Sequence, residues 1–137
     1  MVAIASFFHS SGVRSRELRD VAKANGFQLR ELPRLFEVRW SEFNSSLLVS
    51  MLVSWRALVT YFGMMDDSAL QGYYAYLTKL ENFKLLVFVA DLLFVFSRYH
   101  KKMQLENFNI TDLPDWKSGV MKRLDDLQHS PVLGGWE

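Results

Sequence analysis

The sequence predicts an all-α protein, an irregular bundle of about six helices. Apolar residues recur at spacings of three and four along most of the chain, which is the helix period, and little of the chain is typical of strands. Half of the 137 residues are hydrophobic and 15% are aromatic, so disorder is not expected and a sizeable core can form. We therefore expect residues 1–137 to form a single helical domain or a fragment of one.

The first two helices are expected over residues 2–9 and 13–24, separated by a Ser-Ser-Gly loop. Asn25-Gly26 should end the second, because glycine adopts the left-handed conformation of a helix C-terminus without steric cost. The first begins without a visible cap, and the chain ends on Gly-Gly-Trp-Glu, so we expect truncation at both ends. The second helix is basic on the sides away from its apolar face, where it carries Arg14, Arg16, Arg19 and Lys23.

A long third helix is expected over residues 42–62, ending at Gly63. Ser41 is a good N-cap for it, since a serine hydroxyl can accept a hydrogen bond from an orphan amide of the first turn. The stretch before it is less regular because of Pro33, and should hold one helical turn followed by an extended segment. The apolar stripe is wide enough for two neighbours and predicts a central helix; it comprises Phe43, Leu47, Met51, Trp55, Leu58 and Phe62.

Three further helices should follow. Residues 69–79 form one behind the cap Asp66-Asp67-Ser68, residues 80–83 form a linker, and residues 84–104 form the helix with the most apolar run of the chain. Thr111 can cap a last helix that has Pro114 in its first turn, where a missing amide costs nothing, and that ends at Ser130-Pro131. The expected core-facing residues of these helices are Tyr73, Tyr74, Leu77, Val120, Leu124 and Leu127.

Charge and composition exclude several classes of protein. The net charge is +1, which gives no strong global attraction for nucleic acid or an anionic membrane. Residues 1–60 nevertheless carry eight Arg/Lys against five Asp/Glu, while residues 61–137 carry eight against ten. There is no cysteine, hence no disulfide and no thiolate zinc site. The apolar run 85–96 is shorter than the roughly 18 residues of a membrane span, so it predicts a buried helix, and no signal peptide is visible.

No active site is visible in the sequence. His9, His100 and His129 are scattered and have no i, i+4 partner for a metal. Asp66-Asp67 and Asp125-Asp126 are more simply a helix cap and a solvated face than catalytic pairs. Asp91, alone on an apolar helix, should form a salt bridge with an arginine of another helix. There is no Gly-rich phosphate loop, so we expect no cofactor, no metal and no small-molecule substrate.

The pair Arg39-Trp40 is the one sequence feature that suggests binding. An aromatic face beside a guanidinium can hold an unstacked nucleotide base. The same pair can also be a core anchor at the start of a helix, and the residues alone favour this interpretation. Trp55 lies within the apolar stripe and is expected in the core, whereas the positions of Trp116 and Trp136 stay open.

Five segments carry a resemblance that spans essentially the whole chain. They are Phe7–Arg14, Phe36–Phe43, Ser54–Val59, Ala90–Arg98 and Leu133–Glu137. Together they resemble the central part of hAT-superfamily transposases and of the animal zinc-finger proteins derived from them. In that family an RNase H-like catalytic domain is interrupted by a large helical insertion, and this sequence looks like the start of the insertion. The resemblance implies that Trp40 stacks on a flipped base and that Arg39 contacts a phosphate or a base.

The departures from the family limit what is implied. The two catalytic aspartates belong upstream of Met1, the final glutamate is not assigned to Glu137, and the zinc finger and dimerisation region have no counterpart. The resemblance therefore implies a nuclear, non-catalytic fragment that binds DNA weakly. Two alternatives remain open. One is a helical module for protein partners or self-association, with an exposed apolar patch around Trp116 and Trp136; the other is an inert gene remnant that folds poorly alone.

Overall fold

The structure, a computed structural model, describes residues 1–33, 40–104 and 109–129, with side chains in the third helix from Asn44 onward. This part of the chain is all-helical, which confirms the predicted fold class, although it holds seven α-helices rather than about six. The elements are α1 (Val2–His9), α2 (Gly12–Ala24), α3 (Trp40–Val53), α4 (Trp55–Gly63), α5 (Ser68–Thr78), α6 (Leu80–Met103), the 3₁₀ turn η1 (Ile110–Asp112) and α7 (Leu113–His129).

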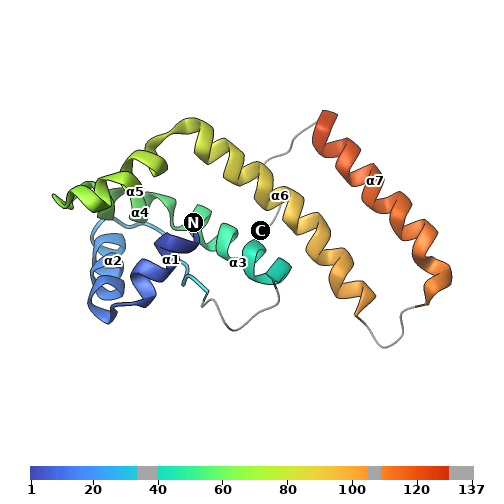
Figure 1. Cartoon of the computed structure of the whole chain (residues 1–137), viewed down its shortest axis with the longest axis horizontal. Coiled ribbons are helices and arrows are strands. Elements are labelled where there is room, and N and C mark those ends of the chain that lie inside the picture. Colours follow the sequence, from blue (N-terminus) through green and yellow to red (C-terminus); the bar gives the residue numbers. More distant parts are fainter. Residues whose placement is uncertain (34–39, 105–108, 130–137) are drawn as a thin grey trace.

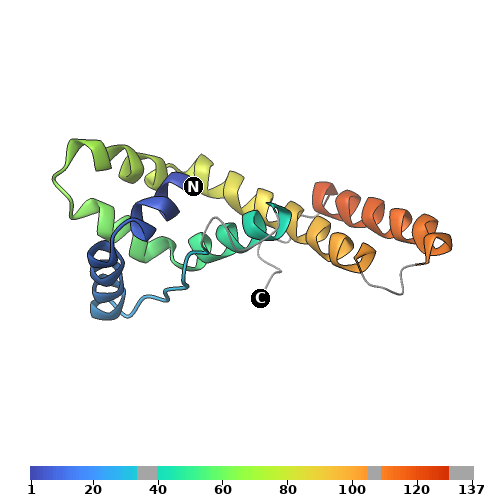
Figure 2. The same cartoon turned by 60° about the horizontal axis from the view of Figure 1, so that its bottom comes forward.

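The helices are arranged as a cluster with a projecting hairpin. In Figures 1 and 2, α1, α2, α4 and α5 gather at one end of an elongated molecule. From there α3 and α6 lie side by side and antiparallel, and α6 continues past the start of α3 to form an antiparallel hairpin with α7. The molecule therefore has a thick end and a thin end, joined by α6.

The thick end has a core of aromatic side chains. Phe62 of α4 is 0% exposed, and its ring centroid lies 5.6 Å from that of Phe7, 5.7 Å from that of Phe8 and 5.2 Å from that of Tyr73. Tyr61, also buried, donates a 2.9 Å hydrogen bond to Oε2 of Glu17 on α2. Burial, aided by this hydrogen bond and by the charge of Glu17, raises the pKa of Tyr61 to about 12. The core thus ties α1, α2, α4 and α5 together.

A smaller apolar cluster joins α3 to α6. Leu48 and Leu52 pack there with Leu86, Val87 and Ala90. Trp55 is partly buried and packs against both clusters, with its ring 5.1 Å from that of Phe83, so its predicted core position is confirmed.

The prediction of one continuous helix over residues 42–62 is wrong. The chain forms α3 and α4, whose axes differ by 68° across the break at Ser54. Ser54 is 0% exposed; its hydroxyl accepts a 2.9 Å hydrogen bond from the Arg30 amide and lies 3.2 Å from the Arg30 carbonyl oxygen, to which it donates. The bend lets α3 pack on α6 while α4 enters the aromatic core, so one apolar stripe serves two cores.

Helix ends are mostly where local sequence signals predict them. Gly26, at φ +64°, closes α2 as expected, with the Phe27 amide donating to the Ala22 carbonyl in a Schellman arrangement. Asp67 caps α5 by accepting a 2.8 Å hydrogen bond from the Ala69 amide. Pro114 lies in the first turn of α7, as predicted.

Two boundaries differ from the prediction. The expected linker 80–83 is helical and opens α6, because Lys79 alone is extended and Asn82 donates a 2.9 Å hydrogen bond to the Tyr76 carbonyl. Asn109, not Thr111, caps the turn before α7, since its side chain accepts from the Thr111 amide. The helical turn and extended segment expected over 34–39, and the stop at Ser130-Pro131, lie outside the described residues.

Candidate nucleic-acid interface

Trp40, the second residue of the Arg39-Trp40 pair, lies at the start of α3. Trp40 is the first residue of α3, so the helix includes the tryptophan and does not begin after it, as was expected. The prediction of Ser41 as the N-cap is wrong, because Ser41 occupies the second helical position and an N-cap has a non-helical backbone. Arg39 lies outside the described residues.

The start of α3 lies beside the middle of α6 (Figures 1 and 2). Because α3 and α6 are antiparallel, the first residues of α3 lie nearer to the C-terminal half of α6 than its last residues do (Figures 1 and 2). The last turns of α6 carry four basic side chains, all exposed, which we call the basic end of α6: Arg98, His100, Lys101 and Lys102. This concentration of positive charge also complements the negative end of the helix dipole.

The basic end of α6 is held against α7 by two close contacts. The Lys102 ammonium lies 5.3 Å from the ring centroid of Trp116, a cation–π distance. Gly119 allows Tyr99 to approach α7, since a Cβ at that position would lie 2.9 Å from the Tyr99 hydroxyl oxygen. Trp116 is therefore a partly buried contact between the two helices. Trp136 lies outside the described residues.

The basic second helix does not share this surface. Both views place α2 in the thick end of the molecule, apart from the start of α3 and from the hairpin. Arg14 turns inward on α1, with its guanidinium carbon 4.1 Å from the ring centroid of Phe7 and a 3.4 Å hydrogen bond to the Phe7 carbonyl. Arg16, Arg19 and Lys23 are exposed there as a separate charged face.

The ionisable residues considered for catalysis lie apart from one another. His9 Nε2 is 3.2 Å from the Pro33 carbonyl, and His129 Nδ1 is 2.9 Å from the Asp125 carbonyl, one turn earlier in α7. Asp91 is buried at 6% exposure, and its salt bridge to an arginine stays a prediction. Among the residues that the structure describes, no group of three His, Cys, Asp or Glu side chains could hold a metal ion.

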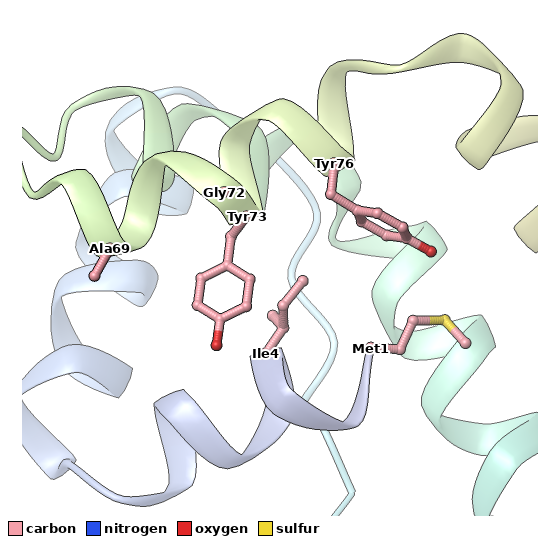
Figure 3. A pocket seen from close by; sticks show the side chains of 6 residues that line it. All are labelled: Met1, Ile4, Ala69, Gly72, Tyr73 and Tyr76. Carbon is pink, nitrogen blue, oxygen red and sulfur yellow. The ribbon is translucent and has the colours of Figure 1, made fainter.

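A pocket of about 400 Å³ lies between α1 and α5, in the thick end. Figure 3 shows Tyr73 pointing from α5 toward α1 beside Ile4, and Tyr76 next to Met1. Ala69 and Gly72 complete the lining. The lining side chains include two phenols and neither a carboxylate nor an imidazole, so the pocket contains none of the candidate catalytic or DNA-binding residues named from the sequence.

Comparison of the chain with protein-family models, with curated proteins and with solved structures finds no match in any of the three. The relation to hAT transposases therefore stays a prediction from the five segments. Within the described ranges no single helix is long and apolar enough to cross a membrane; residues Asn44–Val53 and Trp55–Gly63 meet the length and hydropathy criteria only together, as a pair bent by 68°.

One surface feature of α6 is not predicted by the sequence. Its apolar run predicts a buried helix, yet Leu85 is 57% exposed, Phe88 43% and Phe96 39%. The spacing gives part of the signal, since Leu85 and Phe96 lie on a different face of the helix from the buried Leu86 and Ala90, whereas Phe88 shares the face of the buried Val95. The exposed apolar patch expected around Trp116 and Trp136 stays a prediction: Leu113, one turn before Trp116, is 45% exposed, and Trp136 lies outside the described residues.

Proposed function

We propose that this protein binds unstacked DNA bases at the start of α3, through Trp40 and Arg39, and DNA phosphates through the basic end of α6. The observation that supports this most directly is the antiparallel packing of α3 on α6, because it brings the first residue of α3 toward the helix end that carries Arg98, Lys101 and Lys102. The resemblance to proteins derived from hAT transposases adds a nuclear location to the proposal.

The chemistry of these residues fits a strand with exposed bases. Stacking of a base on an aromatic side chain contributes about 1–3 kcal/mol and tolerates any sequence. Arginine and lysine at the edge of such a platform contact phosphates and release counterions, so that affinity falls steeply with salt. With a net charge of +1 the whole molecule adds little attraction, and binding should be weak and local. The proposal concerns binding and assigns no cleavage step.

Fluorescence anisotropy of a labelled single-stranded or hairpin DNA tests this proposal. At low salt we expect saturable binding that weakens at physiological salt, and a dissociation constant at least about fivefold higher for Trp40→Ala, the lower limit of a stacking contribution. Met64→Ala is the control, because Met64 is 67% exposed at the end of α4, in the thick end of the molecule, and belongs neither to the start of α3 nor to the basic end of α6.

A second pair of variants separates the two basic surfaces. Lys101→Gln combined with Arg98→Gln should weaken binding and reduce its salt dependence, whereas Arg16→Gln with Arg19→Gln in α2 should leave both nearly unchanged. Equal losses from the two pairs would indicate attraction by overall charge alone. No binding by a chain that circular dichroism shows to be helical would contradict the proposal.

A second candidate function is that of a helical module for protein association. The exposed apolar side chains of α6 favour it, because contiguous exposed apolar surface on a soluble helix marks an interaction site more often than chance. This candidate requires neither Trp40 nor the basic end of α6, so the variants above also distinguish the two functions.

A further inference from the structure

The C-terminus of α2 contains the only Asn-Gly pair of the sequence, Asn25-Gly26. In such a pair the glycine amide nitrogen can attack the carbonyl carbon of the asparagine side chain, because no Cβ on the glycine hinders the approach. Both residues are exposed, so water reaches them. A Cβ at Gly26 would meet nothing within 4 Å, which leaves room for the ring that this attack forms.

Hydrogen bonds hold the two reacting groups apart in the folded chain. Nδ2 of Asn25 donates a 2.9 Å bond to the Val21 carbonyl, one turn back in α2. The Gly26 amide, which is the nucleophile, donates to the Lys23 carbonyl at 3.3 Å. Asn25 has ψ 2°, and ring closure requires a rotation of about 120° from there to bring the amide nitrogen in line with Cβ. The reaction therefore requires the last turn of α2 to open.

We propose that Asn25 is a site of spontaneous deamidation, gated by local opening of the last turn of α2. The Gly26 amide nitrogen forms a bond to Cγ of Asn25 while the bond from Cγ to Nδ2 breaks. The amide proton of Gly26 leaves with Nδ2 as ammonia, and a five-membered succinimide ring remains. Water then adds to either ring carbonyl and opens the ring to aspartate or isoaspartate. Nothing is oxidised or reduced, and water is the only co-reactant.

Both products change the end of α2. A carboxylate at position 25 has no proton to donate to the Val21 carbonyl, and its charge opposes the negative end of the helix dipole. Isoaspartate also adds one atom to the main chain, which displaces Gly26 from its turn at φ +64°. The 2.9 Å hydrogen bond from the Phe27 amide to the Ala22 carbonyl depends on this turn.

The segment that follows α2 transmits the change to the core. Phe27 and Leu29 pack against the aromatic cluster of the thick end, and the backbone of Arg30 is bound by the Ser54 hydroxyl at the bend between α3 and α4. Deamidation should therefore loosen residues 27–32 from the core. The inference concerns α2 and not the start of α3, so it goes beyond the proposed DNA binding and does not depend on it.

Peptide mapping by mass spectrometry, after incubation of the folded protein at neutral pH, tests the site. Trypsin cuts after lysine and arginine and releases Asn25 in the peptide Ala24–Arg30. Asn82 is the matched control in the same sample, because its Nδ2 also donates a 2.9 Å bond to a backbone carbonyl but its next residue is Phe83.

We expect Asn25 to deamidate at least about tenfold faster than Asn82, which corresponds to about 1.4 kcal/mol of activation free energy. Aspartate and isoaspartate should separate as two products of the same mass. Equal rates at Asn25 and Asn82 would overturn the proposal.

The synthetic peptide Ala24–Arg30 tests the gating, because it lacks the rest of α2. The two hydrogen bonds that hold Asn25 and Gly26 should make deamidation in the folded protein about 5- to 150-fold slower than in the peptide. Equal rates in the two would contradict the gating. In the deamidated protein, hydrogen–deuterium exchange should be faster at the amides of residues 27–32. Unchanged exchange there would overturn the loosening of this segment.

Discussion

Helices α4 and α7 show how differently the two ends of this molecule are built. In the nine residues of α4, four side chains are buried, namely Ala57, Leu58, Tyr61 and Phe62. The seventeen residues of α7 include none that is buried. The thick end therefore contains most of the apolar packing that stabilises the fold, while α7 leaves most of its side chains exposed. We interpret the first as a scaffold and the second as the surface available for partners.

The largest expected effect compares equivalent leucines at the two ends. Leu58→Ala removes a side chain that is 0% exposed, and should lower the free energy of unfolding by about 2–5 kcal/mol through lost transfer free energy and a cavity. Leu124→Ala on α7, where the side chain is only partly buried, should cost less than about 1.5 kcal/mol. Urea denaturation followed by circular dichroism gives both values. Equal losses would show that the hairpin is as well packed as the core.

The next effect compares two buried serines one turn apart. Ser54→Ala leaves the Arg30 amide and carbonyl without their side-chain partner at the bend between α3 and α4, and should destabilise the protein by about 1–3 kcal/mol. Ser50 is 1% exposed and its hydroxyl has no hydrogen-bond partner in the described part of the chain, so Ser50→Ala should be neutral or stabilising. The same denaturation experiment decides the sign, and a loss for Ser50→Ala similar to that for Ser54→Ala would contradict the assigned role of the bend.

A smaller effect concerns Tyr61 and depends on pH. Its pKa in the folded protein is raised to about 12, against 10 for an unfolded tyrosine. Below pH 10 both states keep the phenol proton and the stabilisation is complete. Between pH 10 and 12 the unfolded state loses this proton first, so the free energy of unfolding falls as the pH rises.

Tyr61→Phe isolates that contribution. It removes the hydrogen bond to Glu17 and should cost about 0.5–1.5 kcal/mol at pH 7. The variant should lose less stability between pH 10 and 12 than the wild type does. Tyr76→Phe, which changes a partly buried tyrosine of α5, serves as the control. Parallel pH dependence in Tyr61→Phe and the wild type would rule out Tyr61 as the titrating group.

The smallest effect compares two glycines within helices. At Gly72 of α5 a Cβ would meet nothing within 4 Å, so Gly72→Ala should stabilise the protein by about 0.5–1 kcal/mol. At Gly119 of α7 the new methyl would lie 2.9 Å from the Tyr99 hydroxyl, and the need to move that side chain should offset the gain. Thermal unfolding of both variants provides the test. A stabilisation by Gly119→Ala as large as that by Gly72→Ala would mean that α7 is not closely packed on α6 at this point.

Local sequence signals predicted the fold class and most helix ends, because caps and C-terminal glycines act within one turn. Gly26 and Asp67 are where a purely local argument puts them. The bend at Ser54 could not be predicted in this way, since it depends on Arg30, which is 24 residues earlier in the chain. The apolar spacing of residues 43–62 is the same whether the helix is straight or divided between two cores.

The candidate site was predictable only in part. Trp40 and Arg39 were identified from the sequence, but the structure gives the neighbourhood of α3, and the basic helix beside its start is α6 and not α2. The exposed apolar side chains of α6 were not predicted, since a run of apolar residues does not reveal which of its faces the rest of the chain covers. Only the positions of α3 and α7 distinguish the buried Val95 from the exposed Phe96.

Hydrogen–deuterium exchange with and without single-stranded DNA tests the division into scaffold and binding surface most directly. At low salt, DNA should slow amide exchange in the first turns of α3 and the last turns of α6, and leave α1, α2, α4 and α5 unchanged. Without DNA, amides of α7 should exchange faster than those of α4. Protection centred on the basic face of α2, or slow exchange throughout α7, would contradict this account.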